Sequence, residues 1–163
     1  MEKLTNATLV FLIKKSKGEI TNICLAMKKR GFGVNRWNGV GGKMETNDKT
    51  IEDTAEREAQ EEIGVCVKSL NKVAELTFFF PHNRKWDQIV HVYFTETWDC
   101  EPMESEEMKP KWFLPSELPF ESMWADDPYW LPEVLKGNLL KAVFEFGEKD
   151  VVKKKKIDIV KEW

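Results

Sequence analysis

Three glutamates of the segment REAQEEIGV, residues 57–65, have a spacing that suits chemistry. Glu58, Glu61 and Glu62 stand at positions i, i+3 and i+4, so their carboxylates project from one face of a helix. Like charges at this spacing destabilise a helix by about 0.2–0.5 kcal/mol per pair, a cost that an ordinary acidic surface helix tolerates. A divalent cation would instead turn the repulsion into an oxygen cage, because Mg²⁺ favours a few carboxylates together with water and substrate phosphates. The acids alone leave both interpretations open.

The residues around these acids predict the helix that positions them. The pattern covers residues 50–63, where Thr50 and Asp53 can form a capping box at the start and Gly64 can end the helix. Apolar side chains recur every four residues, which predicts one buried stripe. That stripe consists of Ile51, Ala55, Ala59 and Ile63.

The segment before this helix is an irregular loop rich in glycine, with Gly39, Gly41 and Gly42 followed by Lys43. Glycine lets a backbone approach a phosphate group or a metal closely. The order of glycine-rich loop, capped helix and Arg-Glu-x-x-Glu-Glu-x-Gly resembles the Nudix box, the defining motif of the Nudix hydrolases. The matching residues are Gly42, Arg57, Glu58, Ala59, Glu61, Glu62, Gly64 and Val65.

This resemblance implies a fold, a metal site and a reaction. The fold is the Nudix α/β/α sandwich of the α+β class, with a central mixed sheet and two main helices, expected as a single domain over residues 1–163. The cofactor is Mg²⁺, with Mn²⁺ as an alternative, and Arg57 orients the carboxylates. The reaction is metal-assisted attack of water on phosphorus, with a glutamate as proton acceptor. The implied metal ligands in the box are Gly42, through its carbonyl, and Glu58, Glu61 and Glu62.

The family often recruits a further acid from outside the box. An acidic loop precedes Trp112, and Glu107 in this loop is the predicted additional metal ligand. Acidic loops are also commonly just solvated, so this alternative stays open. The acids of the loop are Glu104, Glu106 and Glu107.

One part of the box departs from the family pattern. The gap from Gly42 to Arg57 is one residue longer than in the pattern, and the early glutamate position falls on Lys49, beside Asp48. The extra residue is predicted to lie in the turn ETNDK, before the helix and peripheral to the metal cage. We expect it to loosen this loop or to alter the support of Arg57.

Seven further segments are rich in β-forming residues and predict strands of a mixed sheet. The first two form a hairpin around the turn KKSKG, and the last contains four lysines, residues 153–156, that suit a solvated strand edge. The segments cover residues 8–13, 19–27, 73–80, 89–95, 112–114, 139–146 and 151–160.

The stretch MWADDPYW places two adjacent acids, Asp126 and Asp127, among aromatic rings. One interpretation is a helix start, in which Asp127 is the N-cap, Pro128 is the first helical residue, and the helix runs to about Lys136 and stops at Gly137. The other is a site that holds a flat ligand between rings and reads its polar edge.

The stretches MKKRGFGVNRWNGVGGK, ESEEMKPKWF and PFESMWADDPYW resemble those of the MutT-homologue purine nucleoside triphosphatases, which convert 8-oxo-dGTP and 2-oxo-dATP to a monophosphate and pyrophosphate. By this resemblance Asn38, Asp126 and Asp127 read the base edge, and Lys28 approaches the sugar or phosphates. Gln88 is polar where the family has an apolar residue. Six residues would wall the pocket, although ordinary core packing explains each equally well: Thr8, Phe32, Phe78, Met108, Trp124 and Phe146.

The two aspartates also raise a question of protonation. Two adjacent acids in a poorly hydrated pocket do not ionise together easily, so the pKa of one is expected to rise. A carboxylate only accepts hydrogen bonds, whereas a carboxylic acid also donates. A pair that shares one proton could therefore match the edges of more than one oxidised purine.

Composition excludes several other roles. The net charge of −3 and the pI of about 5.6 disfavour a polymeric nucleic acid as partner. Cys24, Cys66 and Cys100 are too widely spaced for a zinc site or a disulfide framework, which suits a reducing compartment. The apolar run near the N-terminus is too short for a membrane span. We expect a monomer in the cytoplasm, or in the nucleus or mitochondria of a eukaryote, with a nucleoside triphosphate as substrate.

Two alternative functions remain open. The box does not name a substrate, so the chain could be a Nudix hydrolase of another nucleoside diphosphate derivative, such as a dinucleoside polyphosphate or a nucleotide sugar. It could also be a non-catalytic nucleotide-binding module that kept the fold. The intact acids Glu58, Glu61 and Glu62 argue against the second alternative.

Overall fold

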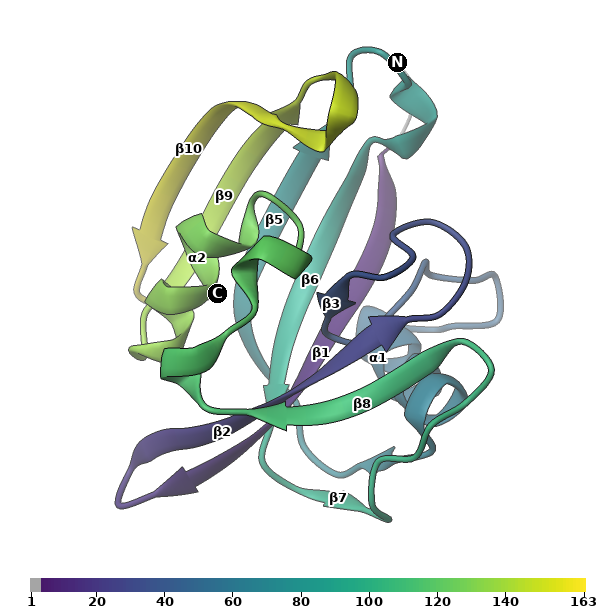
Figure 1. Cartoon of the computed structure of the whole chain (residues 1–163), viewed down its shortest axis with the longest axis vertical. Helices are drawn as coiled ribbons and strands as arrows, with labels where there is room; N and C mark the ends of the chain where they lie inside the picture. Colours follow the sequence, from purple (N-terminus) through teal and green to yellow (C-terminus); the bar gives the residue numbers. More distant parts are fainter. Residues whose placement is uncertain (1–3) are drawn as a thin grey trace.

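A mixed β-sheet forms the framework of the computed structural model, which describes residues 4–163 (Figure 1). The strands of the sheet are β1 (Thr5–Ser16), β2 (Glu19–Lys28), β3 (Trp37–Asn38), β5 (Asn71–Phe79), β6 (Gln88–Thr95), β8 (Met108–Phe113), β9 (Leu139–Phe146) and β10 (Val152–Val160). Within the described residues their order is β10-β9-β5-β6-β1-β2-β3, and β8 pairs with β2. The pairs β1–β6 and β5–β9 are parallel, and the others are antiparallel. The predicted α+β class with a mixed sheet is confirmed.

Two α-helices cover the sheet from opposite sides, α2 (Asp127–Leu135) in front and α1 (Ile51–Ile63) behind in Figure 1. The short strands β4 (Cys66–Val67) and β7 (Trp98–Asp99) pair separately. Neither helix of the part that the structure describes is long and apolar enough to cross a membrane. Single-turn 3₁₀-helices are η1 (Arg84–Trp86), η2 (Pro115–Glu117), η3 (Phe120–Ser122) and η4 (Glu148–Asp150).

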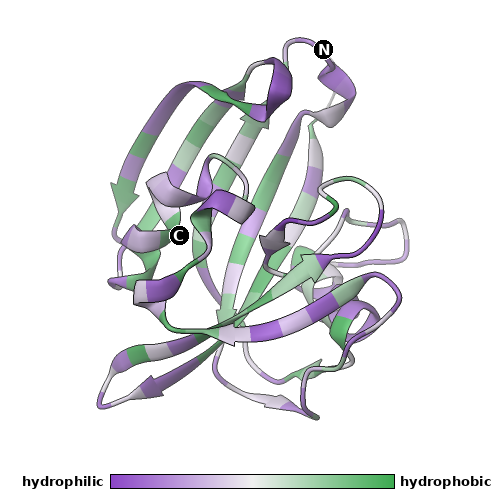
Figure 2. Cartoon of the chain, viewed as in Figure 1, coloured by the Kyte–Doolittle hydropathy of each residue, from purple (hydrophilic) through white to green (hydrophobic). Residues whose placement is uncertain are grey.

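Each face of the sheet has its own hydrophobic core. Phe11 of β1 packs in the larger cluster with Phe144 of β9 and Trp130 of α2. Its neighbour Leu12 belongs to the second cluster, together with Ala59 of α1. Successive residues of a strand point to opposite faces, so β1 contributes to both cores. Figure 2 shows the resulting bands of hydrophobic and hydrophilic residues along the strands.

Helix α1 follows its sequence prediction closely. Thr50 is the N-cap, with its side chain accepting from the Asp53 N–H at 3.1 Å, while the Asp53 side chain accepts from the Thr50 N–H at 3.1 Å. Gly64 ends the helix in the left-handed region, with φ of 72°. Three residues of the predicted stripe are fully buried and Ile51, in the first turn at the margin of the core, is only partly buried. The buried three are Ala55, Ala59 and Ile63.

Helix α2 lies where it was predicted, but the prediction that Asp127 caps it is wrong. The helix begins at Asp127 itself, and Asp126 precedes it without a side-chain capping bond. Asp126 instead accepts a hydrogen bond from the indole of Trp130, four residues further on, and Asp127 is buried with 2% of its surface exposed. The helix ends at Leu135, one residue before the predicted end, and Gly137 follows with φ of 101°.

The predicted strands are confirmed in place, and β9 also in its bounds, whereas the others differ in length. β1 and β2 extend to a tight turn at Lys17 and Gly18, where φ is 52° and 80°. β8 begins at Met108 rather than at Trp112, because residues 108–113 all pair with β2. The lysines at positions 153–156 are exposed on β10, which is an edge strand as predicted.

Candidate active site

The glycine-rich loop is attached to one side of β1. Val10 and Val40 exchange two backbone hydrogen bonds of 2.6 and 3.0 Å, and the Thr8 N–H donates to the Gly42 carbonyl at 2.9 Å. A Cβ on Gly41 would overlap the backbone carbonyl of Thr8, and a Cβ on Gly42 would lie 2.5 Å from Oε1 of Glu58. Both glycines are therefore required for the loop to pass between β1 and the acidic face of α1.

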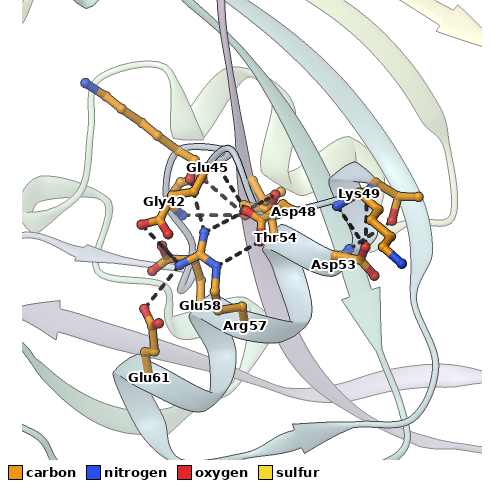
Figure 3. A network of polar contacts seen from close by, with 12 residues as sticks. Gly42, Glu45, Asp48, Lys49, Asp53, Thr54, Arg57, Glu58 and Glu61 are labelled. Carbon is orange, nitrogen blue, oxygen red and sulfur yellow. Dashed lines mark hydrogen bonds and ion pairs between the residues drawn. The ribbon is translucent and has the colours of Figure 1, made fainter.

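Arg57 lies at the centre of a polar network beside this loop (Figure 3). Its Nη1 is 2.9 Å from Oε1 of Glu58 and 3.2 Å from Oε2 of Glu61. Its Nη2 also donates to the Lys43 carbonyl at 3.3 Å. The guanidinium thus connects two glutamates of α1 to the glycine-rich loop, which agrees with the orienting role expected of Arg57.

Asp48 supplies the other side of the network. Its Oδ1 accepts from Nε of Arg57 at 3.0 Å and its Oδ2 from Nη2 at 2.8 Å, and only 6% of its side chain is exposed. The Thr54 hydroxyl and the Glu45 N–H each donate to Oδ2 at 2.9 Å. These hydrogen bonds, the largest from Arg57, hold the pKa of Asp48 well below its usual range. The longer loop has therefore altered the support of Arg57 rather than removed it.

Glu62 is the most deeply buried acid of the helix, with 5% of its surface exposed. Its Oε2 accepts from the Gly41 N–H at 3.2 Å. Burial, reinforced by the negative charges of Glu58 and Glu107, raises the pKa of Glu62 to about 8. Burial also raises the pKa of Glu58, against the opposing effect of Arg57. The helix face thus carries Glu58 and Glu61 paired with Arg57, and Glu62 in surroundings that disfavour its charged form.

A cavity of about 390 Å³ opens beside the two glycines, which belong to its lining. The structure brings all ten predicted substrate residues to this one cavity. They are Thr8, Lys28, Phe32, Asn38, Phe78, Met108, Trp124, Asp126, Asp127 and Phe146. Six of the ten are buried or half-buried apolar or neutral side chains, and Phe32 is exposed, so the cavity suits a largely flat, apolar ligand with a polar edge.

Asp126 and Asp127 form the polar end of the cavity. Oδ2 of Asp126 accepts from Nε1 of Trp130 at 2.8 Å, whereas Oδ2 of Asp127 is buried without a hydrogen-bond partner among the described residues. Burial raises the pKa of Asp126 to about 6. Burial, and then the adjacent charge of Asp126, raise the pKa of Asp127 well above its usual range. An unpaired buried oxygen costs free energy that a ligand donor can recover.

Comparison with known proteins identifies the family. Residues 3–134 match the family described as NUDIX domain. The chain belongs to the Nudix family. It is 39% identical over 156 residues to the oxidized purine nucleoside triphosphate hydrolase of Danio rerio, covering 95% of each chain. It is also 39% identical over 145 residues to the mouse (Mus musculus) protein of the same name, covering 89% of this chain and 88% of the other.

Solved structures share the fold of this Nudix chain. The mutator MutT protein of Bacillus halodurans aligns with a TM-score of 0.77 at 22% identity, covering 95% of this chain and 98% of that one. The NUDIX domain of Shewanella oneidensis NrtR, solved with ADP ribose, aligns with a TM-score of 0.63 at 14% identity, covering 84% and 89%. The predicted Nudix sandwich is therefore confirmed.

Nudix hydrolases generally use a divalent metal, and the residues of this chain fit one. Glu58 and Glu62 stand beside Gly41 and Gly42, where the missing Cβ atoms leave the backbone open. Their raised pKa values are those of crowded carboxylates that a cation would stabilise. Within residues 4–163 no three acidic, histidine or cysteine side chains converge as a preformed metal cluster.

The other two predicted metal ligands lie further out. Glu61 is 59% exposed in its side chain and is paired with Arg57. Glu107 is 47% exposed and paired with Arg30, with 3.3 Å between Nη2 and Oε1. Glu107 nevertheless lies close enough for its charge to influence Glu62. Glu61 and Glu107 thus lie further out than Glu58 and Glu62, and each of the two outer acids is paired with an arginine.

Sequence reasoning missed several residues that line the cavity. Arg36 and Gly33 come from the glycine-rich segment, and Trp86 comes from η1. Gln88, which the sequence marked as a departure from the family, also lines the cavity, at the start of β6. Nothing in the sequence distinguished Arg36 from the other basic residues of its segment.

Proposed function

We propose that this Nudix chain is a Mg²⁺-dependent hydrolase of oxidised purine nucleoside triphosphates, 8-oxo-dGTP and 2-oxo-dATP, that yields the monophosphate and pyrophosphate. The observation that carries the proposal is the buried pair Asp126 and Asp127 in a cavity that also borders Gly41 and Gly42. A bound nucleotide would place its base edge at the aspartate pair and its phosphates beside the two glycines. The names of the two relatives at 39% identity support the same substrate class.

The aspartate pair would recognise the base edge. Burial raises the pKa of both aspartates, which favours a proton on the pair, and a protonated acid can donate a hydrogen bond, while Oδ2 of Asp126 accepts from Trp130. Asn38 lines the same cavity, and its Oδ1 accepts from the Gly39 N–H at 2.9 Å, which leaves its amide N–H groups for a ligand. Together these groups offer donors and acceptors to an oxidised purine, whose edge presents both.

Aromatic and apolar side chains would hold the plane of the base. Trp124, Phe78 and Phe146 line the cavity, and base–aromatic stacking contributes about 1–3 kcal/mol per base without selecting among bases. Lys28 lines the cavity near Glu62, on whose pKa its charge acts, so it suits the sugar or the phosphates. Selectivity would then come from the aspartates and affinity from the rings.

The acidic helix would carry out the hydrolysis. When bound, Mg²⁺ neutralises phosphate oxygens and lowers the pKa of the attacking water. Glu58 and Glu62 with the Gly42 carbonyl would hold it, joined by Glu61 and Glu107. Glu62, the most deeply buried acid of the helix, would take the proton of the water. Arg57 would keep Glu58 and Glu61 in place. The bond between the α- and β-phosphates breaks, and pyrophosphate leaves.

Steady-state rates on a nucleotide panel test the substrate class. The panel contains 8-oxo-dGTP, 2-oxo-dATP, the unmodified triphosphates, a dinucleoside polyphosphate and ADP ribose. We expect the highest kcat/KM for the oxidised purines. A clear preference for unmodified or bridged substrates would instead favour a different Nudix hydrolase. Binding without turnover would favour the non-catalytic module.

Variants of the aspartates test base recognition separately from metal binding. Asp127→Ala and Asp126→Asn should each weaken the binding of 8-oxo-dGMP while leaving the affinity for the divalent metal unchanged. Normal turnover of 8-oxo-dGTP by both variants would contradict the proposed role of the pair.

The proposal also includes a monomeric enzyme of a reducing compartment, the cytoplasm. All three cysteines are free, and Cys24 is buried. Sedimentation of the purified chain at micromolar concentration would measure the oligomeric state.

A further inference from the structure

Residues 28–36 form a narrow loop at the rim of the cavity. The Lys28 N–H donates to the Arg36 carbonyl at 3.1 Å, and the Asn35 N–H donates to the Lys28 carbonyl at 2.8 Å, which closes the loop at its base. Gly33 has φ of 82°, in the left-handed region, and a Cβ there would lie 3.2 Å from the Trp124 indole. The loop is therefore shaped to lie directly against Trp124.

Arg36 connects this loop and Trp124 to a distant part of the chain. Its Cζ lies 4.0 Å from the centroid of the Trp124 ring. Its Nη2 is 3.0 Å from Oδ2 of Asp150, a residue 114 positions away in sequence. The two side chains are only 32% and 28% exposed, so the ion pair is less screened than one at the open surface. Asp150 thus holds the guanidinium on the indole.

Asp150 occupies an unusual turn between β9 and β10. Lys149 and Asp150 have φ of 62° and 57°, in the left-handed region that residues with side chains adopt uncommonly. The Gly147 N–H closes the turn by donating to the Val151 carbonyl at 2.8 Å. Such conformations persist where the surrounding structure requires them. Here the conformation directs the Asp150 carboxylate toward the rim of the cavity.

We propose that Arg36 and Asp150 are positioning residues that fix the plane of Trp124 for stacking on the base of a nucleotide. Asp150 does not belong to the described lining of the cavity, so it acts through Arg36 and Trp124. This inference rests on the proposed function only for the statement that Trp124 forms a wall of the nucleotide pocket. It applies to any nucleotide ligand, because every base has a flat face.

The other contacts of Trp124 explain why this ion pair matters. Phe32 lies 5.1 Å from Trp124 between ring centroids, in a tilted arrangement, and is itself 49% exposed. Phe146 meets Trp124 edge-on at 6.3 Å and 85°. The cation over the ring face adds an attraction to these ring–ring contacts, one of which is to a half-exposed ring. Without Asp150, the guanidinium would turn to solvent, and the indole would lose its fixed orientation.

The consequence is specific to base binding. The ion pair contacts none of the acids of α1, so phosphate chemistry should continue unchanged. We expect KM to rise and kcat to stay constant when the pair is broken. Lysine cannot replace Arg36 fully, because an ammonium group does not stack on a ring and bind a carboxylate with one planar group.

The test compares Asp150→Ala, Asp150→Asn and Arg36→Lys with wild type. A matched control, Glu96→Gln, breaks another ion pair between distant residues, Lys15–Glu96 at 3.3 Å, which lies outside the cavity. Steady-state kinetics use the nucleoside triphosphate that the wild type hydrolyses best. Calorimetry measures the affinity for the matching monophosphate and for inorganic pyrophosphate, which has no base, and thermal scans record Tm.

We expect Asp150→Ala to raise KM and the monophosphate Kd by about three- to tenfold, with kcat within twofold. Asp150→Asn and Arg36→Lys should give smaller losses in the same direction. Pyrophosphate affinity should not change in any variant, and Glu96→Gln should match wild type throughout. The double variant Arg36→Ala/Asp150→Ala should bind the monophosphate no more weakly than Arg36→Ala alone.

Two results would overturn the inference. One is unchanged monophosphate affinity in Asp150→Ala. The other is an equal loss of pyrophosphate and monophosphate affinity together with a lower Tm, which would indicate a structural role.

If the preferred substrate proves not to be an oxidised purine, the proposed function fails, but the base-dependent loss is still measured on the preferred nucleotide. If 8-oxo-dGTP is preferred and no loss is found, only this inference fails.

Discussion

Asp48 binds Arg57 through both carboxylate oxygens, at 3.0 Å to Nε and 2.8 Å to Nη2, from a loop that is one residue longer than the family pattern. The Asp48 side chain is nearly buried, and Arg57 also forms hydrogen bonds with Glu58 and Glu61. A two-point contact fixes both the position and the plane of a guanidinium. Asp48, the neighbour of Lys49 where the pattern expects a glutamate, therefore anchors Arg57 in this chain.

The first prediction concerns this support. Asp48→Ala should lower kcat by about 10- to 100-fold, the usual effect of removing a residue that orients metal ligands. Lys49→Ala, at the exposed neighbouring position, is the control and should keep the wild-type rate. Rates would be measured at saturating metal. Equal rates in Asp48→Ala and wild type would show that Arg57 does not need this anchor.

The second prediction concerns Glu62. Glu62→Gln keeps the shape of the side chain and its acceptor for the Gly41 N–H, so the fold should persist. Without a proton acceptor and a charged ligand, kcat should fall by about 10²- to 10⁴-fold. Circular dichroism checks the fold while single-turnover kinetics measure the chemical step. A rate within twofold of wild type would remove Glu62 from the mechanism.

The third prediction links Glu62 to metal binding. With a pKa of about 8 in the metal-free chain, Glu62 is mainly protonated at pH 7 and must lose its proton to bind a cation. Metal affinity should therefore increase from pH 6 to pH 8 and level off above. Calorimetry in two buffers of different ionisation enthalpy should detect proton release at pH 7, reduced in Glu62→Gln. Binding without proton release would contradict the raised pKa.

The fourth prediction concerns the dependence of stability on pH at the aspartate pair. Burial raises the pKa of Asp126 to about 6 and that of Asp127 further, so the folded chain retains protons that the unfolded chain releases above about pH 4. The free energy of unfolding should then decrease as pH rises from about 4 through 6 and beyond. The difference in Tm between Asp127→Asn and wild type should increase in favour of the variant from pH 4.5 to pH 7.5. A constant Tm difference across that range would argue against the shifted pKa.

The fifth prediction separates two adjacent glycines. A Cβ on Gly42 meets the flexible end of Glu58, at 2.5 Å from Oε1, whereas one on Gly41 meets the rigid backbone of Thr8. Gly42→Ala should therefore reduce metal affinity and rate with little change in Tm. Gly41→Ala should reduce Tm clearly. Thermal scans with and without metal measure both effects, and the reverse pattern would mean that the loop does not lie where the structure places it.

Local sequence signals predicted the acidic helix well. The capping box of Thr50 and Asp53 and the terminal Gly64 act within a few residues of one another, so their pattern is readable without the fold. The family motif likewise predicted which side chains surround the cavity, since all ten lie there. Their roles in binding and catalysis stay predictions.

Interactions between distant segments could not be predicted. Asp127 has the pattern of an N-cap, but it is buried at a cavity whose lining comes from segments far apart in sequence. β8 begins earlier than its pattern suggests, because pairing with β2 compensates for its lysines and Pro110. The contact of Arg36 with Asp150 joins residues 114 positions apart, and no local pattern marks it.

The most direct test of the central claim is a competition experiment. Equimolar 8-oxo-dGTP and dGTP are mixed with the wild-type chain and Mg²⁺, and the two monophosphates and pyrophosphate are quantified at low conversion, which gives the ratio of the kcat/KM values. We expect an excess of 8-oxo-dGMP of at least about tenfold, corresponding to 1.4 kcal/mol of discrimination at the base edge. Equal amounts of the two products, or an excess of dGMP, would contradict it.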